Sequence, residues 1–99
     1  LIYVAEEGQF VKIACAHNLE EGLHKLRKHH PKAEIVAKLK AIETGKAKTA
    51  AQTAVQKELC MEKRAHNGDD WFKIPHGVTV AEIRRIVESA VNSNNQKYE

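Results

Sequence analysis

The sequence predicts an α+β fold in one small domain, and three observations lead to this class. Two segments rich in β-branched and aromatic residues open the chain and are separated by a glycine turn, which is typical of an antiparallel hairpin. Segments of helical periodicity with N-terminal caps then alternate with a segment of period two. A length of 99 residues leaves room for one modest core. We expect the domain to span residues 1–92, followed by a polar tail over 93–99.

The first half of the chain is predicted to form a hairpin, a helix and a third strand. Strands are expected over residues 2–5 and 9–15, because each run is rich in strand-forming residues. A helix begins after Asn18, whose side chain can cap it together with Glu21, and it ends before Pro31. Residues 34–40 alternate between apolar and polar side chains and predict the third strand.

The second half is predicted to be mainly helical. Residues 46–64 are rich in good helix formers and indicate the longest helix. A polar break over 66–70 leads to a short aromatic strand over 71–74, and Thr79 begins the closing helix. The predicted order is ββαβα plus a short strand and a C-terminal helix. We therefore expect a three-stranded, mainly antiparallel sheet with flanking helices.

Composition and cysteine usage restrict the functional classes. No apolar run approaches the roughly 18 residues that a membrane span needs. Cys15 and Cys60 belong to no metal-type pair, which predicts two reduced thiols in a cytoplasmic protein. A zinc site that adds His17 and His66 to them fits no tetrahedral signature. We therefore expect no membrane segment and no resident metal or cofactor.

Basic side chains gather in three clusters, although the net charge is only +3. The first cluster lies within residues 24–33, which contain no acid, and two others follow on 38–48 and 63–64. Clustered Lys and Arg neutralise phosphates, but a solvated helix face is an equally good reading of any one cluster. We expect DNA as the partner, with a protein partner as the alternative. The candidate nucleic-acid-binding residues are Lys25, Arg27, Lys28, Lys32, Lys63 and Arg64.

Four short motifs occur in a specific order along residues 1–3, 11–14, 18–23 and 68–72: Leu-Ile-Tyr, Val-Lys-Ile-Ala, Asn-Leu-Glu-Glu-Gly-Leu and Gly-Asp-Asp-Trp-Phe. Together they resemble the GIY-YIG nuclease superfamily, in its small phage and bacterial single-domain branch. The resemblance implies a phosphodiesterase fold in which a helix-borne glutamate holds one divalent metal. It also implies a tyrosine near the metal or water and an arginine on the first helix that faces the phosphate.

At the positions of that arginine and glutamate, the chain has Gly22 and Gln52, whereas Tyr3 and Lys12 are retained. Loss of such a charged stabiliser costs on the order of 100-fold to 1000-fold in rate, and an amide is a weak ligand for Mg²⁺. We therefore expect a GIY-YIG-like domain that binds nucleic acid or a partner and has lost or weakened nuclease activity. Whether the two replacements are natural or engineered stays open.

The alternative function is a divalent-metal-dependent endonuclease that cleaves DNA and requires Mg²⁺. In this reading the register of the long helix differs, and Glu58 or Glu62 supplies the metal ligand. Trp71 and Phe72 also have two readings, since they can fill the core or stack against bases.

Overall fold

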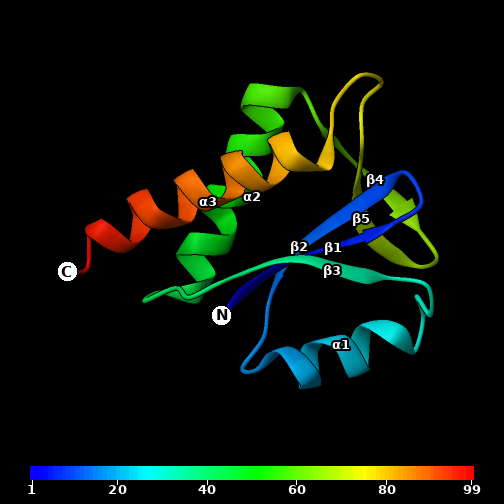
Figure 1. Cartoon of the computed structure of the whole chain (residues 1–99), viewed down its shortest axis with the longest axis horizontal. Coiled ribbons are helices and arrows are strands. Elements are labelled where there is room, and N and C mark those ends of the chain that lie inside the picture. The colour runs from blue at the N-terminus through cyan, green and yellow to red at the C-terminus, as the bar shows by residue number, and fades with distance from the viewer.

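The computed structural model describes all residues, 1–99, as a five-stranded antiparallel sheet with helices on both faces (Figure 1). Helix α1 covers one face, and α2 and α3 cover the other. The strand order across the sheet is β3-β1-β2-β5-β4. The elements are β1 (Ile2–Glu7), β2 (Phe10–Cys15), α1 (Leu19–Arg27), β3 (Glu34–Leu39), α2 (Thr44–Leu59), β4 (Glu62–His66), β5 (Asp69–Lys73) and α3 (Val80–Gln96).

The α+β class and the antiparallel first hairpin are confirmed, but the expected three-stranded sheet is wrong. The long helix ends at Leu59, because Cys60 adopts a left-handed conformation with φ 53° that cannot continue it. Residues 62–66, which we had assigned to the helix end and the break after it, form the edge strand β4. Asn67 and Gly68 then take positive φ values of 49° and 89° and form a tight turn into β5.

Strand pairing decides which side chains of the first hairpin face α1. Tyr3 on β1 lies opposite Ala14 on β2, and Ala5 lies opposite Lys12. Because successive strand residues point to opposite faces, these four side chains share the α1 side of the sheet. The intervening residues, such as Val4 and Ile13, face α2 and α3.

Each face of the sheet has its own hydrophobic core. The larger core lies under α2 and α3 and includes Phe72, while the smaller one lies under α1 and includes Trp71. Both aromatic side chains are fully buried, so their packing role is confirmed and base stacking is excluded. The smaller core consists of Tyr3, Ala5, Leu26, Ala33 and Trp71.

The closing helix extends further than the sequence indicated. Its capping box of Thr79 and Glu82 is present, as predicted. The helix continues to Gln96, and Asn94 is buried. The side chain of Asn95 donates to the carbonyl of Lys40 and accepts from the amide of Ile42. The segment after residue 92 is therefore anchored to the domain through Asn95. None of the helices has the length and apolar character that crossing a membrane requires.

Candidate functional site

Four polar side chains that are distant in sequence meet on the α1 side of the sheet: Glu7, His30, His66 and Asp69. We call them the His30 cluster. His30 is fully buried, although histidine is usually only partly buried in proteins. Its position between two carboxylates makes the cluster the most chemically distinctive feature of the molecule.

Two turns and one loop position this cluster. Glu7 and Phe10 are the paired residues that close the first hairpin across Gly8, whose φ of 61° suits glycine. His66 and Asp69 are the corresponding pair that closes the second hairpin across Asn67 and Gly68. His30 comes from the loop between α1 and β3. The first turn therefore positions Glu7, and the second positions His66 and Asp69, through the backbone conformation of the turn residues.

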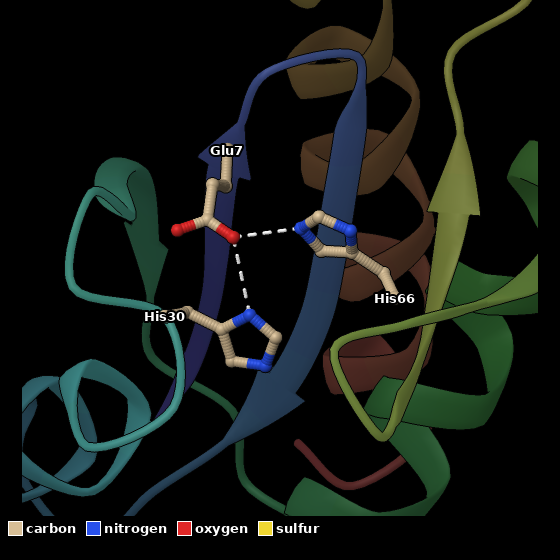
Figure 2. A group of neighbouring side chains, drawn as sticks. All are labelled: Glu7, His30 and His66. Atoms are coloured by element: carbon tan, nitrogen blue, oxygen red, sulfur yellow. Dashed lines mark hydrogen bonds and ion pairs between the residues drawn. The ribbon is translucent and has the colours of Figure 1, made fainter.

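Figure 2 shows one carboxylate oxygen of Glu7 placed between the two imidazole rings. Glu7 Oε1 lies 2.7 Å from His66 Nε2 and 3.2 Å from His30 Nδ1. The other nitrogen of the buried ring, His30 Nε2, lies 2.7 Å from Asp69 Oδ2. The same Asp69 oxygen lies 3.7 Å from Lys12 Nζ. The backbone amide of Lys32 donates to Glu7 Oε2 at 3.3 Å.

These contacts favour the charged forms of both carboxylates. Burial acts to raise the pKa of Glu7, but hydrogen bonds from His66, from His30 and from the amide of Lys32 outweigh it and hold that pKa below its ordinary value. The pKa of Asp69 is lowered, chiefly by its hydrogen bond with His30 and further by the charge of Lys12. Both carboxylates are therefore ionised at neutral pH and available to a cation.

Aromatic rings pack against the cluster, and a surface pocket borders it. His66 stacks on Phe10 with ring centroids 4.3 Å apart, and His30 lies 4.6 Å from the Trp71 ring. The indole Nε1 of Trp71 is buried without an acceptor in the protein. A surface pocket of about 550 Å³ is lined by both Glu7 and His66, so the cluster is reachable from solvent.

The predicted catalytic residues are only partly brought together. Tyr3, Lys12 and Gly22 lie on the α1 side of the sheet, where a Cβ on Gly22 would come within 3.2 Å of Tyr3 Cε1. Burial chiefly, and then electrostatic interactions with Cys15 and Asp69, raise the pKa of Tyr3, which keeps its phenol protonated. Because Gly22 has no side chain, it leaves the space into which the Tyr3 ring packs.

Gln52 lies on α2 at the other side of the sheet. Its Nε2 donates to the backbone carbonyl of Ile13 at 3.0 Å. β2 pairs with β5 only at Phe10 and Val11, so this amide satisfies a carbonyl that has no strand partner on that edge. The residues present do not fit the magnesium site that the family resemblance implies. Of the two alternative acids, Glu58 is exposed on α2, and Glu62 lies on β4, where it pairs with Arg64.

The predicted phosphate-binding residues divide into two groups. Lys25, Lys28 and Lys32 are exposed at α1 and the loop after it. Arg27 is turned back, and its guanidinium donates to the carbonyl of Ala33. The other group consists of Lys63 and Arg64, which are neighbours on β4 and therefore point to opposite faces of the sheet. The expectation that they lie at the end of the long helix is wrong.

Sequence reasoning missed the His30 cluster as a site. The sequence placed His66 only in a hypothetical zinc site with His17 and the two cysteines, and both cysteines are exposed and free. Glu7 and Asp69 were read as turn residues and as part of a motif. The available signal was an Asn-Gly dipeptide flanked by a histidine and an aspartate, which predicts a hairpin closed by that pair.

Comparisons with known proteins give no relative: no protein-family model, curated protein or solved structure matches this chain. The GIY-YIG resemblance therefore remains an expectation from short motifs, and any function has to be argued from the structure itself.

Proposed function

We propose that this chain is a nucleic-acid-binding domain that does not cleave its ligand and that acts in an intracellular setting. DNA is the expected ligand. The proposal depends mainly on one observation, three exposed lysines on and just after α1: Lys25, Lys28 and Lys32. We call these three residues the α1 basic face.

The α1 basic face is suited to a phosphate backbone. Lys25 lies in the last turn of α1, and Lys28, three residues on, is its C-cap residue with helical φ and ψ angles, so the two side chains project on the same side. Lys25 has one acidic neighbour, Glu21 at 3.5 Å, but this exposed pair is weak and releases its lysine readily. Lysines of this kind bind phosphates by charge, with release of counterions and little dependence on base sequence.

The absence of turnover is supported by the roles of the two replaced residues. Gly22 accommodates the ring of Tyr3, and Gln52 donates to a backbone carbonyl on the other side of the sheet. Neither residue can stabilise phosphate charge or hold Mg²⁺, and both have local packing or hydrogen-bonding functions. Because both residues have structural roles in place of catalytic ones, we favour binding without cleavage.

Reversal of two charges on the α1 basic face should weaken DNA binding. For the variant Lys25→Glu with Lys28→Glu, we expect the affinity for a labelled 20-base-pair duplex to fall by about tenfold or more at ~0.1 M salt. The slope of log affinity against log salt should also become shallower by roughly two, because about one unit is lost for each phosphate contact. Fluorescence anisotropy over a series of salt concentrations measures both quantities.

The matched control changes the same net charge on the opposite face. Lys57 on α2 and Arg84 on α3 are exposed and form no ion pair, so Lys57→Glu with Arg84→Glu alters the total charge equally. This control should bind nearly as well as the original chain. Equal losses of DNA affinity in the two variants would show that the DNA interface does not lie at α1. If the original chain had no measurable DNA affinity, a protein partner would be the remaining candidate.

A further inference from the structure

We propose that Glu7, His30 and His66 form a binding site for a divalent first-row transition metal of the zinc type. Their ligand atoms, one from each side chain, all lie within 4.8 Å of one another. Ligands about 2.0–2.1 Å from a tetrahedral zinc ion stand roughly 3.3 Å apart. The 3.2 Å between His30 Nδ1 and Glu7 Oε1 is close to this value, and the 2.7 Å between His66 Nε2 and Glu7 Oε1 has to lengthen by about 0.6 Å. The two imidazole nitrogens, which lie within 4.8 Å of each other, have to reach the same spacing.

The hydrogen bonds of His30 carry the proposal furthest. A neutral imidazole has one N–H, yet each nitrogen of this buried ring faces a carboxylate oxygen. If Nε2–H donates to Asp69 at 2.7 Å, Nδ1 presents a lone pair to Glu7 Oε1. A contact between these two acceptors is satisfied either by a further N–H on the ring or by a metal ion bound between Nδ1 and Oε1. The second imidazole, His66, faces the same oxygen, so a metal ion there would gain a third ligand.

The surrounding contacts are those that orient metal ligands. Histidine ligands commonly donate their second N–H to a carboxylate, which fixes the tautomer and raises the basicity of the ligand nitrogen. Asp69 has this position relative to His30, and Lys12 in turn approaches Asp69 at 3.7 Å. The second oxygen of Glu7 accepts from the amide of Lys32, so Oε1 is the oxygen that faces the two imidazole nitrogens. Figure 2 shows Oε1 turned toward both rings and Oε2 turned away.

Ligand chemistry and access both favour a zinc-type ion. Two imidazoles and one carboxylate suit zinc and its first-row neighbours, whereas Mg²⁺ prefers an all-oxygen octahedron. The pocket of about 550 Å³ reaches Glu7 and His66, so an ion can enter and a fourth position is open to water or an exogenous ligand. This proposal differs from the sequence-based expectation of no resident metal. The sequence did not predict the site because its three ligands lie in separate segments and share no metal-binding spacing.

The test is a titration of the chelator-treated chain with Zn²⁺, followed by isothermal calorimetry, and with Co²⁺, followed by visible absorption. We expect saturable binding of one ion per chain. Asp69→Asn should weaken binding by roughly 10-fold to 100-fold, as for other residues that orient a ligand. Direct removal of a ligand in His66→Ala should weaken it further. His76→Ala removes an exposed histidine outside this pocket and should bind like the original chain.

Glu7→Gln provides a second ligand variant that keeps the size of the side chain, in case His66→Ala is poorly folded. Circular dichroism of each variant reports its folding separately from its metal affinity. Absence of saturable binding would overturn the proposal. Unchanged affinity in both Glu7→Gln and His66→Ala would overturn it as well, since the ion would then be bound elsewhere on the chain.

Discussion

Replacement of His30 by alanine should lower the free energy of unfolding of the metal-free protein by about 3 kcal/mol. The ring is fully buried and packs 4.6 Å from the Trp71 ring, so its loss leaves a cavity. It also removes a hydrogen-bond partner from two carboxylates. Glu7, whose side chain is only 12% exposed, regains little from water, whereas Asp69 is 39% exposed and becomes hydrated. Urea unfolding in the presence of a chelator measures the change.

His29→Ala is the matched control for this variant. His29 is adjacent in sequence and exposed, and its side chain forms no hydrogen bond, so the change should stay within about 0.5 kcal/mol. A loss in His30→Ala no larger than in this control would mean that the His30 cluster does not hold the α1–β3 loop against the sheet.

Restoration of the two family residues should destabilise the chain rather than improve it. A Cβ at position 22 would lie 2.8 Å from the Cβ of Ala16 and 3.2 Å from Tyr3 Cε1, and the first of these atoms is fixed to the backbone. Gly22→Ala gains up to about 1 kcal/mol in helix propensity, but overpacking of this kind costs about 1–3 kcal/mol, so a net loss near 1 kcal/mol is expected. Gly22→Arg should lose more.

Gln52→Glu should add to this loss, because a carboxylate cannot donate to the carbonyl of Ile13 and would repel it. Gly45→Ala is the control for Gly22→Ala, since a Cβ there meets only Glu43 Oε1, the movable end of a side chain, at 3.3 Å. Thermal melts of the four variants compare them directly. A stabilised Gly22→Ala would contradict our account, because it would show that the glycine is not required by the packing of Tyr3.

Local signals in the sequence were sufficient for most elements of the fold. The first hairpin, the cap at Asn18 and the capping box at Thr79 all depend on neighbouring residues, and each was predicted correctly. The end of α2 was missed because residues 60–64 contain good helix formers. Their strand conformation depends on pairing with β5, which is a tertiary effect. The strand count was wrong for this reason.

The candidate site could be predicted only in part. Tyr3, Lys12 and Gly22 share the α1 side of the sheet, which follows from strand alternation and the order of elements. The placement of Gln52 on the other side depends on which face α2 covers, and no local pattern reports this. His30 is harder still, because its partners Glu7 and Asp69 are 23 and 39 residues away and meet it only in the folded chain.

The most direct test of the central claim, binding without cleavage, uses supercoiled plasmid incubated with the chain and Mg²⁺ or Mn²⁺. Our account predicts retarded migration in a native gel, and after removal of the protein, plasmid that is still fully supercoiled. The accumulation of nicked circles, in proportion to the amount of the original chain and absent with Lys25→Glu and Lys28→Glu, would contradict it.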